Sequence, residues 1–515
     1  MADRKTQRKH LFGSSEKTDF IMNLTDAGTK KLCALYCIIA MIIIEAVAIP
    51  YYLTKNVIDY TEPVIGTEIV LKHYVSEKVI YWASVAMFGI GLLGLCVFMI
   101  GKMKNQYKLA DNKALLWLGG VMIMSLISSL TADELLYAFT GYQDRAEGFI
   151  TLIGYYGFFA AAFTVVADNW RTRLCGTIIG IGAVNAVIGI LQTVPALRGK
   201  IPNWFNTLSK PSFFNMATSE EVDIPAANGL AMTPHALAAL LTVSLAVALA
   251  AFIFAEKPLY KCLSGCSTVV MTVAGILTRT TTALIGLGTA AVVVFVIAIV
   301  YAAKNKGAKA EEGSEALAPA RRVLLLGCIG LVAVVGTGVI MHLAGAVKLE
   351  DEYVIRQDSE RMLMVFRRED DSMWVYPYMW DDGLYFSEDD PLLGTGPDNL
   401  GKMQELGAVI DRSYNEYIDI AVQRGWITLG LYVVFLLITV VKGFRALALF
   451  VRREVNWAAA AAMAAVTAYM VQAFFNISAL TSSPFFYICA GLCWSYFARL
   501  SVAEKNEKKR KALED

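Results

Sequence analysis

The sequence is poor in charge. Only 18% of its 515 residues are charged, against about a quarter in soluble domains, while 56% are hydrophobic and the mean hydropathy is +0.51. None of the 46 Lys and Arg residues falls inside a long apolar run, as expected if a charge at bilayer depth costs about 2.5–3.5 kcal/mol. This scarcity excludes an ordinary soluble domain. The net charge of +1 provides no basic field, so no nucleic-acid partner is expected.

Cysteine and histidine are also scarce where a disulfide framework or a metal site would need them. The nine cysteines lie in or beside apolar runs, which makes a disulfide framework unexpected. The pairs Cys33/Cys37 and Cys262/Cys266 have helical spacing, but no histidine converges on them, and apolar packing explains them better. The four histidines show no ligand spacing. The sequence therefore supports no metal site.

Long apolar runs are what the sequence has in abundance. A run of about 20 residues spans roughly 30 Å of hydrocarbon. Such runs occur at residues 32–53, 79–100, 114–130, 150–167, 174–191, 236–255, 262–277, 283–303, 323–344, 427–441, 457–475 and 479–497. We predict an all-α membrane protein with about twelve transmembrane helices. The first run is too long for a signal-peptide core and is expected to stay in the mature protein.

The distribution of Lys and Arg predicts the orientation. With the N-terminus in the cytoplasm, the tails and even-numbered connections hold 30 Lys and Arg and the opposite side holds 16, of which eight lie in one long loop. Long loops are translocated largely regardless of charge, so both termini are predicted to be cytoplasmic. The predicted parts are a cytoplasmic tail at 1–31, helices 1–9 at 32–344, a large exported loop at 345–426, helices 10–12 at 427–497 and a basic cytoplasmic tail at 498–515.

The exported loop between helices 9 and 10 is predicted to be functional, because a long loop in a compact protein usually is. It is rich in acids and carries an aromatic cluster. This cluster is either a sugar-stacking surface or a set of interfacial anchors, and comprises Trp374, Tyr376, Tyr378, Trp380, Tyr385 and Phe386.

Three arginines, Arg145, Arg279 and Arg424, are predicted near the exported ends of helices. A single arginine there would be read as an interfacial charge with its side chain reaching water. Three together favour a cationic site. Arg279 is the most informative, since the connection around it has about five residues and no other charge. Guanidinium suits bidentate phosphate contacts, which points to a lipid-linked diphosphate.

A second group of polar residues precedes helix 10. The stretch Pro391-Leu-Leu-Gly-Thr-Gly-Pro-Asp398-Asn predicts a tight turn. It is followed by a polar helix start, and the two segments together carry Asp398, Asp411, Arg412, Tyr414, Asn415 and Glu416. This arrangement is either a plain helix cap with a solvated loop or a set of acids and amides at the mouth of a membrane site.

Together these motifs resemble the O-antigen ligase and O-antigen polymerase superfamily of bacterial membrane glycosyltransferases. The resemblance is carried by Arg145-Ala-Glu147-Gly, by Thr233-Pro-His235-Ala, by Arg279 with Ala283-Leu-Ile-Gly-Leu, and by residues 394–430. It implies transfer of a glycan from an undecaprenyl diphosphate carrier to an acceptor hydroxyl at the outer face of a bacterial cytoplasmic membrane, without a cofactor. The implied partners are a lipid-linked oligosaccharide donor, a glycan, lipid or protein acceptor, and the bilayer.

The resemblance also suggests roles for individual residues. It implies that Arg145 and Arg279, with Arg424, hold the diphosphate. The residues expected to contact substrate or acceptor are His235, Glu147, Asp398 and Arg412. Those expected to carry catalysis are Glu416, Tyr414, Asp411 and Asn415.

The chain departs from the family pattern at Tyr414. Many relatives have a histidine there, for which a role in activating the acceptor hydroxyl is proposed, whereas a phenol is a poor base at neutral pH. Glu416, Asp411 or His235 would then take the proton, and Tyr414 would position the sugar. We favour Glu416 as the proton acceptor.

Two other functions are open at this point. A transporter or flippase of the lipid-linked glycan would usually show repeats, broken helices and ionisable residues at the membrane midplane. The polar residues of this chain instead gather at one face. A sensor or scaffold would not need the arginines.

Overall fold

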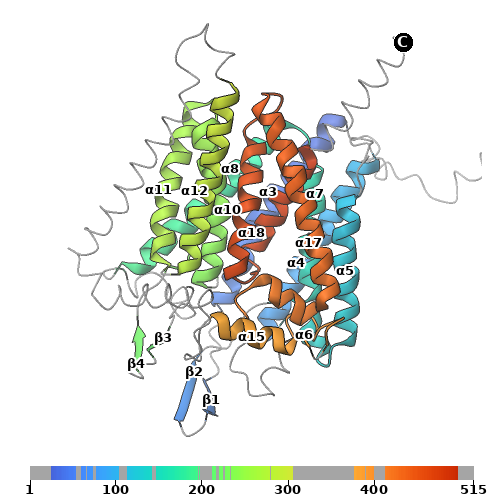
Figure 1. Cartoon of the computed structure of the whole chain (residues 1–515), viewed down its shortest axis with the longest axis vertical. Helices are drawn as coiled ribbons and strands as arrows, with labels where there is room; N and C mark the ends of the chain where they lie inside the picture. The colour runs from blue at the N-terminus through green and yellow to red at the C-terminus, as the bar shows by residue number, and fades with distance from the viewer. Residues whose placement is uncertain are drawn as a thin grey trace, which may run out of the picture.

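The computed structural model is a bundle of long apolar helices (Figure 1). It describes residues 25–53, 59–64, 67–72, 77–103, 113–141, 146–194, 197, 212–215, 220–223, 227–231, 233–278, 280–305, 376–388, 390–399 and 412–496. Within these ranges, eight helices are long and apolar enough to cross a membrane. They are α3 (Asp26–Leu53), α4 (Glu77–Met103), α8 (Asp168–Thr193), α10 (Pro234–Phe254), α11 (Pro258–Leu277), α12 (Thr281–Lys304), α17 (Glu416–Val451) and α18 (Ala458–Gln472).

Shorter elements complete the described chain. Five further helices are α5 (Lys113–Thr131), α6 (Leu135–Thr140), α7 (Phe149–Phe163), α15 (Tyr376–Phe386) and an unlabelled one at 483–496, while η5 (Ala473–Phe475) extends α18 by a 3-10 turn. Two antiparallel hairpins pair β1 (Asp59–Val64) with β2 (Thr67–Lys72) and β3 (Ser212–Asn215) with β4 (Glu220–Asp223). In the first hairpin Asp59 lies opposite Lys72, and in the second Ser212 lies opposite Asp223.

The prediction of a helical, multi-pass membrane protein is confirmed. Eleven of the twelve apolar runs coincide with a described helix, and the ninth, at 323–344, lies outside the described residues. The count of twelve, and the exported loop as a unit, therefore stay predictions. Most of that loop and both predicted tails also lie largely outside the described residues.

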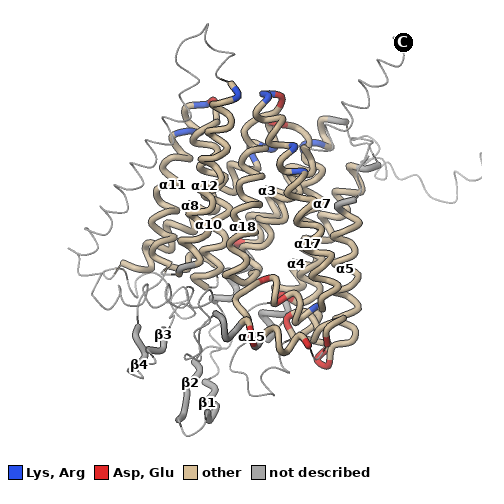
Figure 2. Tube along the Cα trace, in the orientation of Figure 1, with Lys and Arg blue, Asp and Glu red and all other residues tan. Residues whose placement is uncertain are grey.

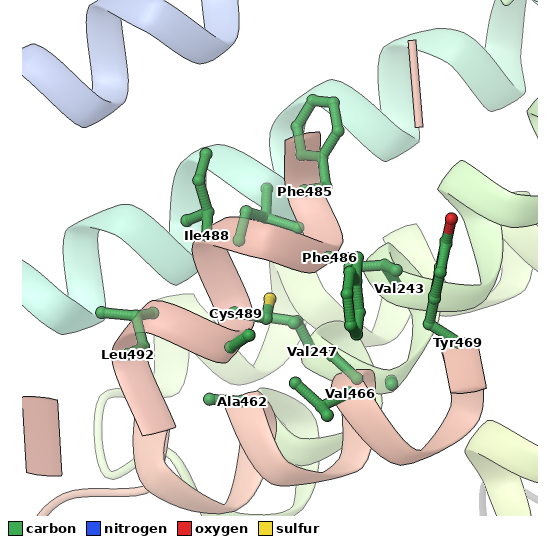
Figure 3. Packing of buried hydrophobic residues seen from close by; sticks show 14 of the residues in the cluster. Val243, Val247, Ala462, Val466, Tyr469, Phe485, Phe486, Ile488, Cys489 and Leu492 are labelled. Carbon is green, nitrogen blue, oxygen red and sulfur yellow. The ribbon is translucent and has the colours of Figure 1, made fainter. Parts of the chain in front are cut away.

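Helix α10 forms the centre of the bundle because its sequence is apolar on every side. It begins at a Thr233 cap, whose Oγ1 accepts from the N–H of Ala236 at 3.1 Å, and Pro234 suits the first helical turn. It packs against α8, α11, α12 and α18. Figure 3 shows Val243 and Val247 of α10 in the buried cluster that also contains Ala462 and Val466 of α18. Apolar residues all round a helix are typical of complete burial.

Small residues allow neighbouring helices to approach closely. In α4 and α7, Gly91, Gly94, Gly154 and Gly157 face one another, and a Cβ added at Gly157 would overlap the backbone of Gly91. The alanine-rich start of α18 is buried in the same way. Close backbone approach through small residues is the usual mode of helix packing in lipid.

Charge divides the bundle into two ends (Figure 2). Lys and Arg concentrate at the upper end in that view, and Asp and Glu at the lower end. We call the lower one the acidic end; among the described residues it comprises 132–141, 146–148, 227–231, 233, 278, 280, 376–388, 390–399, 412–424 and 473–482. The opposite, basic end comprises 165–171, 255–258, 304–305 and 452–457.

A buried arginine lies at the basic end. Arg171 donates from Nε to the carbonyl of Val165 at 2.9 Å and from Nη2 to Oγ of Ser495 at 2.7 Å. Its Nη1 pairs with Asp168 at 2.9 Å, and its guanidinium lies 3.8 Å from the ring centroid of Tyr496. The group therefore ties α8 to the helix at 483–496.

Candidate active site

The acidic end is built around a break in α17. Gly425 has φ 82°, a left-handed conformation that divides the helix into 416–424 and 426–451. The N–H of Trp426 donates to the carbonyl of Pro391 at 2.9 Å instead of to a residue of its own helix. The carbonyls released at Val422 and Gln423 accept from the N–H groups of Thr395 and Gly396, at 3.1 and 2.8 Å. The 390–399 loop thus fills the break and satisfies its backbone groups.

The break fixes the side chains next to it. Gln423 accepts through Oε1 from the N–H of Asp398 at 3.1 Å, and its carbonyl also accepts from Ser128 Oγ of α5 at 3.0 Å. Asp398 has φ 55° and is fully buried. Arg424, the next residue along, is half-buried, and its Nε has no hydrogen-bond partner among the described residues.

Arg412 holds three acidic segments together. Its Nη2 donates to Glu147 Oε2 at 3.1 Å and to Asp398 Oδ1 at 3.0 Å, and its Nη1 lies 3.9 Å from Asp419 Oδ2. Asp419 also accepts from the N–H and the hydroxyl of Ser413, at 2.9 and 2.8 Å. All five side chains are buried. We call Arg412, Glu147, Asp398, Asp419 and Ser413 the Arg412 cluster.

Glu147 accepts hydrogen bonds from several side chains. Besides Arg412, it accepts from the hydroxyl of Tyr155 at 2.7 Å and from Ser478 Oγ at 2.9 Å. Its own N–H donates to Asp398 Oδ2 at 3.3 Å. A carboxylate with this many donors is held in one position and has little capacity left for a substrate.

Glu416 lies beside the Arg412 cluster and is bonded more lightly. Each carboxylate oxygen accepts one phenol hydrogen, from Tyr432 at 2.8 Å and from Tyr469 at 2.9 Å. The Tyr469 ring stacks on Phe486, with centroids 4.5 Å apart (Figure 3). Glu416 is buried and interacts electrostatically with Glu147 and Arg424. It therefore keeps lone pairs for a further donor.

Tyr414 and His235 meet across the site. Their rings form an edge-to-face contact with centroids 5.1 Å apart, and Tyr414 has φ 51°. Asn415 caps α17, since its Oδ1 accepts from the N–H groups of Tyr417 and Ile418 at 3.0 and 3.3 Å. That bonding gives Asn415 a structural role at the helix start.

The turn after α18 connects the remaining parts of the site. The carbonyl of Phe475 accepts from Thr282 Oγ1 of α12 at 3.1 Å. Asn476 donates from Nδ2 to the carbonyl of His235 at 3.0 Å, and Ser478 bonds Glu147 as described. The ring of Phe475 also lies 6.0 Å from that of Trp380 in α15. This turn thus joins the α10, α12 and Glu147 segments.

The structure brings together most of the predicted site residues that it describes. Glu147, Asp398 and Arg412 form one network, Glu416 interacts electrostatically with Glu147, and Tyr414 contacts His235. Three predicted residues, Arg145, Arg279 and Asp411, lie outside the described residues, as does Trp374. Ala146 directly follows Arg145 and Thr278 directly precedes Arg279. Both residues are buried at the acidic end.

Several residues of the network were missed in the sequence. They are Tyr155, Ser413, Asp419, Gln423, Tyr432, Tyr469, Asn476 and Ser478. Asp419 carried a usable signal, because it follows Glu416 by three residues and so lies on nearly the same helix face. The tyrosines gave none, since they sit within apolar runs where packing is the default interpretation. Among the described residues, no group of three His, Cys, Asp or Glu side chains is arranged to hold a metal ion.

Fold and site together define a multi-pass membrane protein with a polar, carboxylate-rich centre at one end of the bundle. The family model described as O-antigen ligase matches residues 266–433, from α11 to the membrane helix of α17. Over this stretch, about a third of its length, the chain is similar to the O-antigen ligase family, whose members are membrane glycosyltransferases or ligases. No curated protein matches the chain.

Proposed function

We propose that the chain transfers a glycan from an undecaprenyl diphosphate carrier to an acceptor hydroxyl at the outer face of a bacterial cytoplasmic membrane. The family match supports glycan transfer in general. The donor rests on the three arginines predicted at the acidic end. A ligase and a polymerase would use the same donor and differ in the acceptor.

One observation carries the proposal. Buried polar atoms without a hydrogen-bond partner are rare in native proteins, yet many of those in the described chain lie at the acidic end or directly beside it. They belong to Asn228, Trp380, Thr395, Gln423, Arg424, Gln472 and Thr481. A site that binds a hydroxyl-rich, charged substrate requires such unpaired groups, whereas a purely structural end would have paired them.

The reaction needs a proton acceptor and a stabilised leaving group. The acceptor oxygen attacks the anomeric carbon, the bond from that carbon to the diphosphate breaks, and the diphosphate leaves with the bonding electrons. Glu416 takes the hydroxyl proton, since Glu147 already accepts from Arg412, Tyr155 and Ser478 and its charge is paired with Arg412. Arg145, Arg279 and Arg424 neutralise the diphosphate.

A flippase of the same lipid is the second candidate, and the break at Gly425 is the feature that favours it, since broken helices are common in transporters. The break here is filled by the 390–399 loop and lies at one end of the bundle. Transfer of labelled glycan by purified protein in detergent, where no second leaflet exists, separates an enzyme from a flippase.

The arginines provide the test. Arg145→Ala, Arg279→Ala and Arg424→Ala should each reduce glycan transfer by at least about 100-fold, because each removes charge stabilisation of the leaving group. Lysine at the same three positions should restore little of the lost glycan transfer if the arginine–phosphate contact is bidentate. Arg452→Ala, at an exposed position of the basic end, is the matched control and should retain activity. Full activity in all three variants, with the lipid-linked donor extracted from cells, would exclude the proposed site.

A further inference from the structure

The turn that precedes α10 is held rigidly. Gln192 of α8 accepts through Oε1 from the N–H groups of Asn228 and Gly229, at 3.1 and 2.9 Å, and donates from Nε2 to the carbonyl of Gly229 at 3.0 Å. Asn185 Oδ1 accepts from the N–H of Leu230 at 2.8 Å. Gly229 has φ 59°, and an added Cβ would press on Asn185. The backbone around Asn228 therefore has one conformation.

The side chain of Asn228 has no comparable partners. It is 0% exposed, and neither its Oδ1 nor its Nδ2 makes a hydrogen bond within the described chain. An unpaired buried polar group costs about 1–3 kcal/mol, and this amide has two of them. A leucine of similar size would avoid that cost, so the amide is expected to serve a ligand.

The position of the turn indicates which part of a ligand it would meet. The N–H of Ala227 donates to the carbonyl of Leu277 at 2.8 Å. The turn therefore lies against the end of α11, and Arg279 follows Leu277 by two residues in the sequence. If Arg279 holds the diphosphate, as proposed above, Asn228 lies next to the sugar that the diphosphate carries.

We infer that the Asn228 carboxamide binds the sugar attached to the diphosphate. The amide offers one unpaired acceptor and one unpaired donor pair. An ionised diphosphate has acceptors only and would leave Oδ1 unsatisfied. A sugar hydroxyl or an acetamido group supplies both a donor and an acceptor. The inference rests on the proposed function and assigns Asn228 to donor recognition, separately from the arginines.

The test compares two ligands in purified protein: lipid-linked glycan extracted from cells, and undecaprenyl diphosphate without sugar. Asn228→Leu should raise the KM for the glycan-bearing donor about tenfold or more, the effect of one lost hydrogen bond. It should change the affinity for undecaprenyl diphosphate less than about twofold, leave the KM for the acceptor unchanged, and leave the unfolding temperature equal or higher. Asn169→Leu, at an exposed asparagine of α8 near the basic end, is the matched control.

Each other result would overturn the inference. If Asn228→Leu weakens the binding of both ligands equally, Asn228 contacts the phosphates. If it raises only the KM for the acceptor, Asn228 contacts the acceptor glycan. A lower unfolding temperature with unchanged KM values would make it structural. If the unmodified protein binds neither ligand, the proposed function itself is wrong and the inference about Asn228 fails with it.

Discussion

Arg412 is the residue on which the acidic end depends. One guanidinium faces Glu147, Asp398 and Asp419, which come from three separate segments of the chain. Carboxylates gathered in a buried place repel one another strongly unless a cation lies between them. Because its charge is committed to these acids, Arg412 is better suited to position Glu147 and the start of α17 than to bind a phosphate.

The first prediction follows from this arrangement. Arg412→Ala leaves buried carboxylates without their cation and should reduce the free energy of unfolding by about 3–5 kcal/mol. The measurement is the unfolding temperature of detergent-solubilised protein. Arg452→Ala at the exposed basic end should lower it little. Equal stability of the two variants would show that the Arg412 ion pairs do not hold the fold.

The second prediction concerns Tyr414 and Glu416. Tyr414→Phe keeps the edge-to-face contact with His235 and should retain measurable transfer, because the phenol only orients the sugar. Glu416→Gln keeps the shape but removes the proton acceptor, and should be as inactive as Arg279→Ala. Glu388→Gln, at an exposed position after α15, is the control. An inactive, folded Tyr414→Phe beside an active Glu416→Gln would reverse the two roles.

The sequence could predict the chemistry of the site but not its pairing. The sequence showed three acids, Glu147, Asp398 and Glu416, and one arginine, Arg412, beside apolar runs. The bond from Arg412 to Glu147 joins residues 265 positions apart, and only the packing of α7 against its neighbours brings them together. Unpaired amides such as that of Asn228 are visible only once the surrounding hydrogen bonds are known.

At the scale of the element, the break in α17 is the decisive feature. A Cβ at Gly425 would overlap the carbonyl of Leu392, and the left-handed φ is unfavourable for any other residue. The third prediction is that Gly425→Ala displaces the 390–399 loop, destabilises the protein by at least about 1–2 kcal/mol and strongly reduces transfer. Gly430 lies on the same helix and has open space around its Cβ position. Gly430→Ala should therefore change neither the unfolding free energy nor the glycan transfer.

Helices were predictable where a single physical signal decided them. Each long apolar run within the described residues is a helix because lipid leaves the backbone no other partner. The short elements α6 and α15 were not predicted, since neither is long enough to give a membrane signal. The segment from Tyr414 onward was predicted to lead into a helix that enters the membrane, but the break at Gly425 within α17 was not predicted.

For the whole molecule, the fourth prediction concerns orientation. By the positive-inside rule, the excess of Lys and Arg at the basic end predicts that this end lies in the cytoplasm. In a variant without native cysteines, Glu388→Cys should react with an impermeant maleimide in intact cells, and Glu256→Cys should not. Both positions are exposed, so accessibility of the thiol is matched. Labelling in the opposite pattern would invert the orientation.

Arg171 has a consequence for biogenesis. Its hydroxyl partner, Ser495, is synthesised 324 residues later, so during insertion the guanidinium of α8 has only its local partners, Asp168 and Val165. Arrival of the last helix buries the charge against Ser495 and Tyr496. A nascent or truncated chain that lacks this helix therefore leaves the guanidinium at the basic end without the contacts that cover it in the complete bundle.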